Sequence, residues 1–444
     1  MNYLIKNASV VNEGEIAQLD VLIENGFISK IERNINTDKN VTEINAEGLH
    51  LLPGAIDDQV HFREPGLTHK GELYTEAKAA VAGGVTSYME MPNTKPSAVT
   101  KELLEQKYTR AAQCSLANYS FYMGTTNSNL DELLRIDYKN VCGIKIFMGS
   151  STGDMLVDDP KALENIFSKT NVIITTHCED DPLVKLNQKR IIEQYGEDLE
   201  AYFHPIIRSE EACYNSSKFA VELAKKHNTR LHILHISTAK ELSLFTNTIS
   251  LKEKRITAEA CIHHLWFSDE DYKTKGNFIK WNPAVKTSYD RAKIFEAVLN
   301  GTIDVVATDH APHTLAEKNE KYLNAPSGGP LVQHSILAML DFYHQGKITL
   351  PHIVKTMSHN VADMFDINKR GYIREGYYAD MVLVNLNKSN LVTKESLLYK
   401  CGWSPFEGHT FKSSIEKTFV NGHLVFNNGV FDESRFGERL LFNR

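Results

Sequence analysis

Short runs of alternating hydrophobic and polar side chains occur at both ends of the chain. Asn-Gly pairs at 25–26 and 421–422 separate neighbouring runs, and such pairs are typical of tight turns between antiparallel strands. We therefore predict one small β-sandwich built from residues 1–52 and 371–444 together. The runs include Val21-Leu-Ile, Ile28-Ser-Lys-Ile31, Met381-Val-Leu-Val384 and 418–426.

Eight short apolar, β-prone runs recur between these two ends, separated by longer segments that suit helices. In one such segment Leu73, Ala77 and Ala80 recur at helical spacing, and the pattern stops at Gly83-Gly84. Eight strand-helix units predict a TIM-type (β/α)8 barrel over 53–370, although a short apolar run is also compatible with a buried helix. The eight runs are 54–61, 84–91, 117–124, 141–148, 171–178, 230–237, 256–263 and 303–310.

Polar, reactive side chains stand near the ends of several of these runs. Barrel enzymes carry their chemistry at the carboxyl ends of the strands, so these side chains are expected at one shared mouth. A single histidine in an apolar strand is more often a core residue, but several in successive strands favour a metal site. The residues concerned are His61, Lys145, His177, His235 and Asp309.

The first barrel run leads into a distinctive polar stretch. On a strand, Asp57, Gln59 and His61 share one face, and Arg63 follows two residues later. If that face lines the barrel mouth, His61 points inward as a ligand and Arg63 lies where a substrate anion would bind. The spacing predicts a metal beside an anion pocket.

Composition narrows the class of protein. A net charge of −7 without a basic cluster gives no reason to expect nucleic acid, and no apolar run reaches the roughly 18 residues that span a bilayer. The six cysteines form no CxxC pair, which suits a reducing compartment. We expect a cytoplasmic protein without a signal peptide, and a homo-oligomer is the common default for such enzymes.

The stretch Asp57-x-Gln59-x-His61-x-Arg63-Glu-Pro-Gly66 resembles the Asp-x-His-x-His-x-Arg-Glu-Pro-Gly signature of dihydroorotases, in the cyclic amidohydrolase group. The family's first metal-binding histidine is Gln59 here. A neutral amide is a poorer zinc ligand than imidazole, so one of the two metal positions is expected to bind more weakly.

The resemblance implies a zinc site of one or two ions. Gly143-Ile-Lys145-Ile-Phe-Met matches the segment whose lysine, carboxylated by carbon dioxide, bridges the ions. Asp154 is an alternative bridging ligand, because some bacterial dihydroorotases use a downstream aspartate. The resemblance assigns His61 and Asp309 to the first ion and His177 and His235 to the second, which we expect to fill first.

The resemblance also implies how the substrate is held. Arg63, Asn93 and His313 resemble the residues that bind the substrate carboxylate, and allantoinases and dihydropyrimidinases usually lack this arginine. A surface ion pair with Glu64 or Glu90 is the alternative for Arg63. Weaker likenesses, in ordinary turn sequences, mark further substrate-binding candidates: Asn282, Ser327 and Gly328.

The implied activity is that of a dihydroorotase, with a small-molecule substrate: the reversible cyclisation of N-carbamoyl-L-aspartate to L-dihydroorotate in pyrimidine synthesis. Metal-bound hydroxide would open the ring, and Asp309 would pass the proton to nitrogen. Two alternatives stay open. One is a hydrolase of allantoin or a dihydropyrimidine, and the other is a non-catalytic scaffold subunit in which Gln59 marks a lost ligand.

Overall fold

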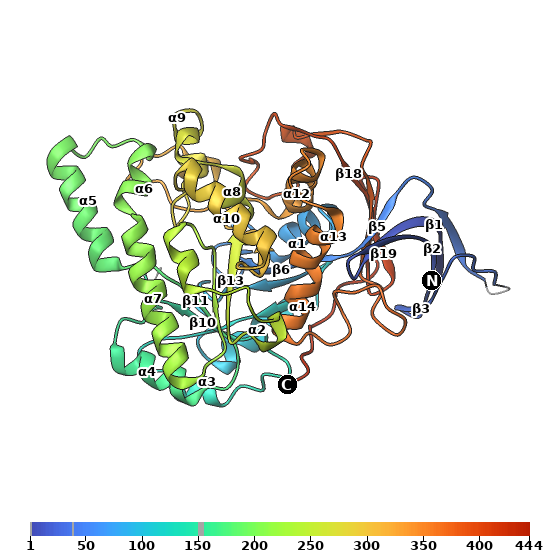
Figure 1. Ribbon diagram of the computed structural model, residues 1–444, viewed down its shortest axis with the longest axis horizontal. Helices are drawn as coiled ribbons and strands as arrows, with labels where there is room; N and C mark the ends of the chain where they lie inside the picture. The colour runs from blue at the N-terminus through green and yellow to red at the C-terminus, as the bar shows by residue number, and fades with distance from the viewer. Residues whose placement is uncertain (1, 38–39, 150–154) are drawn as a thin grey trace.

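The computed structural model describes residues 2–37, 40–149 and 155–444. Its centre is a ring of parallel strands, each lying within one of the eight predicted runs (Figure 1). The third run forms two short strands in succession, β8 and β9. The barrel strands are β6 (Ala55–Val60), β7 (Val85–Glu90), β8 (Asn118–Phe121), β9 (Met123–Gly124), β10 (Ile144–Phe147), β11 (Ile174–His177), β12 (Leu231–Ile233), β13 (Ile256–Cys261) and β14 (Val305–Ala307).

Backbone hydrogen bonds close these strands into a barrel. β6, β7 and β8 form one parallel sheet and β9 to β14 form another. The two sheets are joined where Tyr122 N donates to Glu90 O at 3.0 Å and Met123 N donates to Gly143 O at 3.0 Å. On the other side His61 N donates to His310 O at 2.7 Å, which connects β6 to the end of β14.

Helices pack around the outside of the barrel (Figure 1). The predicted helix is confirmed as α1, which buries Leu73, Ala77 and Ala80 and ends before Gly83. The helices are α1 (Leu73–Ala82), α2 (Lys101–Ala111), α3 (Leu130–Leu134), α4 (Pro160–Lys169), α5 (Asp181–Tyr195), α6 (His204–Ile207), α7 (Glu210–His227), α8 (Ile262–Trp266), α9 (Tyr272–Lys275), α10 (Ser288–Asn300), α11 (Leu315–Lys318), α12 (Ser335–His344), α13 (Leu350–Val354) and α14 (Asn360–Phe365).

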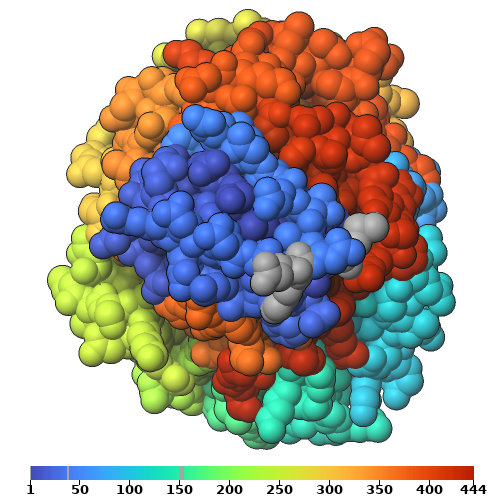
Figure 2. Space-filling model, turned by 90° about the vertical axis from the view of Figure 1, so that its right-hand side faces the viewer, coloured from blue at the N-terminus to red at the C-terminus, as the bar shows by residue number. Residues whose placement is uncertain are grey.

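Strands from both chain ends form a second, mixed sheet beside the barrel. Its order is β20-β19-β18-β15-β5-β1-β2-β3, with β4 paired to β1. The two ends meet where β15 pairs antiparallel with β5, and Figure 2 shows N-terminal and C-terminal residues side by side on this face. The strands are β1 (Tyr3–Asn12), β2 (Glu15–Glu24), β3 (Phe27–Glu32), β4 (Thr42–Asn45), β5 (His50–Pro53), β15 (Met381–Asn385), β18 (Ser414–Val420), β19 (His423–Asn427) and β20 (Val430–Phe431).

Both predicted Asn-Gly turns are present. Asn25 and Asn421 adopt left-handed backbone conformations, with φ of 53° and 51°, between β2 and β3 and between β18 and β19. The predicted fold class, a barrel with a small sheet domain drawn from both ends, is therefore confirmed. β16 (Asn390–Leu391) and β17 (Thr410–Phe411) form a separate two-stranded antiparallel sheet. We propose 53 and 370 as the limits of the barrel domain.

A buried ion pair joins the sheet domain to the barrel. The Arg370 guanidinium contacts the Asp380 carboxylate, and both side chains are only 3% exposed. Asp380 also accepts hydrogen bonds from Asn118 Nδ2 on β8, at 3.2 and 3.3 Å, and from Asn421 N in the β18–β19 turn, at 2.7 Å. One carboxylate therefore holds a barrel strand, a sheet turn and the connecting segment together.

Replacing Arg370 by alanine should leave the Asp380 charge buried without its cation. We expect Arg370→Ala to lower the free energy of unfolding by about 3–5 kcal/mol, measured by urea denaturation. The control is Arg135→Ala, which removes an ion pair to Glu132 from a side chain that is 63% exposed. That change should cost only about 0–1 kcal/mol. Equal losses in the two variants would contradict the role assigned to the junction.

Candidate functional site

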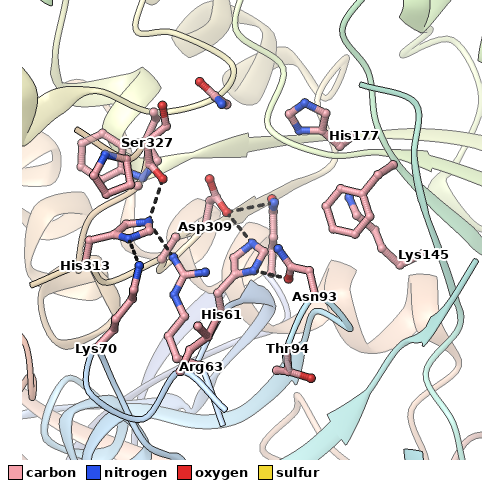
Figure 3. A pocket seen from close by; sticks show the side chains of 18 of the residues that line it. His61, Arg63, Lys70, Asn93, Thr94, Lys145, His177, Asp309, His313 and Ser327 are labelled. Carbon is pink, nitrogen blue, oxygen red and sulfur yellow. Dashed lines mark hydrogen bonds and ion pairs between the residues drawn. The ribbon is translucent and has the colours of Figure 1, made fainter. Parts of the chain in front are cut away.

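A cavity of about 510 Å³ opens at the carboxyl ends of the barrel strands. Its wall contains every residue that the sequence singled out as a metal, catalytic or substrate candidate within the described ranges. Figure 3 labels several of them, including Arg63, Lys145 and Asp309. These residues are His61, Arg63, Asn93, Lys145, His177, His235, Asn282, Asp309, His313, Ser327 and Gly328, together with Gln59. Asp154, the alternative to Lys145, lies outside the described residues.

Two histidines face each other on one side of the cavity. His177 Nδ1 lies 3.0 Å from His235 Nε2, and His177 Nε2 donates to Glu179 Oε2 at 3.0 Å. Because His177 carries its proton on Nε2, its Nδ1 keeps a lone pair turned toward His235. Burial lowers the pKa of both imidazoles, which keeps them neutral. Two neutral imidazole nitrogens that converge in this way fit a bound metal ion.

The amine of Lys145 lies within the same barrel interior. Its side chain is almost completely buried, and Nζ lies 4.5 Å from the centre of the Phe147 ring. Burial lowers the pKa of Lys145 to about 7, because removing an ammonium from water is costly. A large share of the amine is therefore uncharged near neutral pH. An uncharged amine is the form that adds carbon dioxide, so Lys145 fits the bridging position.

Gln59 takes part in a hydrogen-bond chain beside His61. Its amide nitrogen donates to Asp309 Oδ1 at 3.1 Å, while its oxygen lies 3.6 Å from Cys261 Sγ. His61 Nε2 lies 3.2 Å from the same Asp309 oxygen, and His61 Nδ1 contacts Asn93 Oδ1 at 2.8 Å. This side thus offers one imidazole and one carboxylate to a metal, and the Gln59 oxygen lies against the Cys261 thiol.

Asp309 is a carboxyl group suited to proton transfer. Burial raises its pKa to about 7, since its charge is removed from water. An acid with this pKa exchanges its proton readily near neutral pH. Among the cavity residues, Asp309 therefore combines a central position with proton-transfer capability.

Arg63 forms the cationic part of the cavity. Its Nε donates to Pro312 O at 3.0 Å, and Nη2 lies 3.0 Å from His313 Nε2 (Figure 3). The alternative of a surface ion pair is wrong: Arg63 is 7% exposed, Glu64 pairs with Arg110 at 2.7 Å and Glu90 pairs with Lys107 at 2.8 Å. Burial lowers the pKa of Arg63 only to about 10, so it stays charged at neutral pH. This part of the cavity suits a carboxylate.

Three cavity residues have strained backbones. Arg63, His235 and Asp309 adopt positive φ angles of 72°, 39° and 48° at or just after strand ends. Residues other than glycine rarely adopt this conformation, and it is concentrated at functional sites because the surrounding fold enforces it. The strain directs these three side chains into the cavity.

Gly66 allows two cavity loops to meet. It has φ of 82°, and a Cβ atom at this position would lie 2.0 Å from Lys95 O. The loops are also joined by Lys95 N donating to Pro65 O at 3.1 Å. The glycine of the Arg-Glu-Pro-Gly motif is therefore required for close backbone packing.

Several contributing residues were not found from the sequence. Glu179 orients His177 and is contacted in turn by Arg208, and Lys70 Nζ lies 2.9 Å from His313 Nδ1. The i, i+2 spacing of His177 and Glu179 was the available signal for the first of these. Asp57, placed with Gln59 and His61, does not line the cavity and instead accepts a hydrogen bond from Thr308 Oγ1 at 2.5 Å. The strand register shifts between Asp57 and Val60, which breaks the simple alternation.

Comparison with known proteins agrees with this geometry. The model of the amidohydrolase family matches residues 50–425, so the chain belongs to the amidohydrolase family. Several dihydroorotases resemble it over most of the chain, which confirms the resemblance drawn from the motifs. The dihydroorotase of Bacillus subtilis is 33% identical over 441 residues, covering 97% of this chain and 99% of that protein. The dihydroorotase of Methanosarcina acetivorans is 31% identical over 415 residues, covering 91% and 88%.

Solved structures support the fold. The L-hydantoinase (dihydropyrimidinase) of Arthrobacter aurescens superposes with a TM-score of 0.94 at 24% identity, covering 99% of both chains. At this identity the likeness concerns the fold alone. Taken with the family match, the chain is a cyclic amidohydrolase. Within the described ranges, none of the helices combines the length and apolar character that crossing a bilayer requires.

Glu179 provides a test of how the histidine pair is oriented. Burial opposes its ionisation, but Arg208 and His177 hold the pKa of Glu179 well below its usual range, so it stays a carboxylate. Glu179→Gln should weaken the hold on His177 and lower zinc affinity about 10–100-fold, measured by competition with a chromophoric chelator. Glu193→Gln, on an exposed part of α5, is the matched control. Unchanged affinity in Glu179→Gln would show that the carboxylate does not orient the ligand.

Proposed function

We propose that the protein is a dihydroorotase, which interconverts N-carbamoyl-L-aspartate and L-dihydroorotate, with release of water on ring closure, in pyrimidine synthesis. The observation that carries the proposal is the buried Arg63 guanidinium beside His313, at one end of the same cavity as the facing histidines. Dihydroorotate carries a carboxylate on its ring, whereas allantoin and dihydrouracil are neutral. A buried arginine without a matching anion in the substrate would be a costly arrangement.

The cavity residues divide into two groups around the reacting amide. His177, His235 and carboxylated Lys145 would hold one zinc ion, and His61 and Asp309 the other, more weakly because Gln59 replaces a histidine. Bound zinc supplies Lewis acidity and lowers the pKa of water in the cavity. Arg63, Asn93 and His313 would bind the substrate carboxylate. Asn282, Ser327 and Gly328 would contact the substrate ring from the cavity wall.

Asp309 would move the proton. In ring opening its carboxylate takes a proton from the attacking water and gives it to the ring nitrogen that leaves the carbonyl carbon. Ring closure runs the same transfers in reverse. The pKa of Asp309, about 7 in the described protein, lets it act in both directions near neutral pH. Its hydrogen bond from Gln59 would hold the carboxylate in place for this transfer.

The substrate assignment is tested by comparing three ring openings. Zinc-loaded protein should hydrolyse L-dihydroorotate, and allantoin and dihydrouracil much more slowly or not at all. Arg63→Gln should lower kcat/KM for dihydroorotate roughly 10- to 100-fold, because a charged hydrogen-bond donor to the carboxylate is lost. Arg135→Gln, at an exposed site, is the control. Faster turnover of allantoin or dihydrouracil than of dihydroorotate would favour an allantoinase or dihydropyrimidinase activity. No turnover of any of the three by folded, zinc-loaded protein would favour a non-catalytic scaffold subunit.

The proton-transfer role is tested by Asp309→Asn. The variant should fold and retain zinc at the His177–His235 pair, but kcat should fall about 10²–10⁴-fold because the amide can neither accept nor donate the proton. Circular dichroism and zinc analysis on the same sample separate this loss from unfolding. Asp198→Asn, with a side chain that is 84% exposed, should keep full activity. Undiminished turnover in Asp309→Asn would remove this residue from the mechanism.

A further inference from the structure

A second cluster of ionisable side chains lies inside the barrel, apart from the cavity. Asp58 on β6, His232 on β12 and Glu259 on β13 are all 0% exposed, and none of them lines the cavity. One ligand atom from each residue lies within 4.8 Å of the other two. β12 and β13 are paired in one sheet, whereas β6 belongs to the other, so the cluster joins the two sheets inside the barrel.

Several atoms of this cluster have no hydrogen bonds within the described part of the protein. They are both carboxylate oxygens of Asp58, Oε2 of Glu259 and Nε2 of His232. His232 Nε2 lies 3.3 Å from Asp58 Oδ2 and 3.9 Å from Glu259 Oε2, but neither contact has the geometry of a hydrogen bond. Buried polar atoms are nearly always paired, so unpaired atoms from three neighbouring side chains require an explanation.

The outer atoms of the same side chains are firmly held. The Thr257 hydroxyl donates to Leu231 O at 3.3 Å, so its oxygen accepts from His232 Nδ1 at 2.8 Å. Glu259 Oε1 accepts from His235 N at 2.8 Å and from Cys261 Sγ at 3.2 Å. The proton of His232 is thereby fixed on Nδ1, which leaves Nε2 free to act as a ligand. Hydrogen bonds behind a ligand atom, as seen here, are typical of metal sites.

The charges of the cluster also favour a cation. Two carboxylates and a neutral imidazole are balanced by one divalent ion. Without an ion, two buried carboxylates would lie together with a single imidazole, and a divalent ion bound between the three side chains would compensate both charges.

We propose that Asp58, His232 and Glu259 bind a divalent transition-metal ion of the zinc class inside the barrel, separate from the ions of the catalytic cavity. One imidazole nitrogen and carboxylate oxygens are suitable ligands for zinc or manganese. The ion connects β6 to β12 and β13 across the barrel. It also lies close to the cavity floor, because the Cys261 thiol contacts both Glu259 Oε1, at 3.2 Å, and Gln59 Oε1, at 3.6 Å.

The decisive measurement uses the unaltered protein. Crystals grown from zinc-loaded protein, with diffraction data collected on both sides of the zinc absorption edge, should show an anomalous peak about 2.0–2.2 Å from His232 Nε2 and a carboxylate oxygen. A peak in the cavity without one at Asp58 would overturn the proposal, and so would the absence of both. The result does not depend on the proposed activity: the buried peak in a protein that fails to open dihydroorotate supports this site while refuting that function.

Metal content provides a second, independent test. His177→Ala/His235→Ala removes the facing imidazoles of the cavity, and adding Asp58→Asn to this variant should lower bound zinc by about one ion per chain, measured by inductively coupled plasma mass spectrometry. Asp341→Asn, which alters another buried carboxylate, is the matched control and should leave zinc content unchanged. Equal zinc content with and without Asp58→Asn would contradict the proposal. If Asp58→Asn does not fold, the anomalous diffraction decides.

Discussion

The exclusion of water from a closed barrel is the constraint on which the rest of this structure depends. An ionised side chain inside the barrel is stable only beside an opposite charge. Burial therefore lowers the pKa of Lys145 and raises that of Asp309, each to about 7. The same constraint keeps His177 and His235 neutral, as ligands must be. The pKa shifts that make these side chains reactive therefore depend on closure of the barrel. In an open cleft the same groups would keep their ordinary pKa values.

Gln59 shows how one substitution alters such a site without dismantling it. An imidazole at this position would offer a lone pair to a metal, whereas the amide nitrogen donates to Asp309 and the amide oxygen lies 3.6 Å from the Cys261 thiol. The exchange removes a ligand, but the amide still finds polar neighbours inside the barrel. The remaining candidate ligands therefore keep their positions around the cavity.

Much of the fold and of the site follows from short-range patterns. The barrel strands fall within the eight predicted runs because buried parallel strands are continuously apolar. The residues after them converge because such strands end at one edge of the barrel. Glu179 was missed because its short spacing from His177 does not by itself show that the two side chains meet. Arg208 was missed because it comes from a distant segment that only the fold brings to Glu179. Asp58 was missed because a register shift in β6 breaks the alternation that sequence analysis assumes.

The packing of Gly66 against Lys95 also bears on motion. The two backbones meet with no room for a side chain at Gly66, and Lys95 N donates a hydrogen bond to Pro65 O. These contacts join the loops after β6 and β7 into one rigid body. Arg63 and Asn93 are carried by these two loops, so thermal motion displaces them together and preserves the distance between them. The entropy of ordering the anion-binding groups is thus lost during folding, and substrate binding need not supply it again.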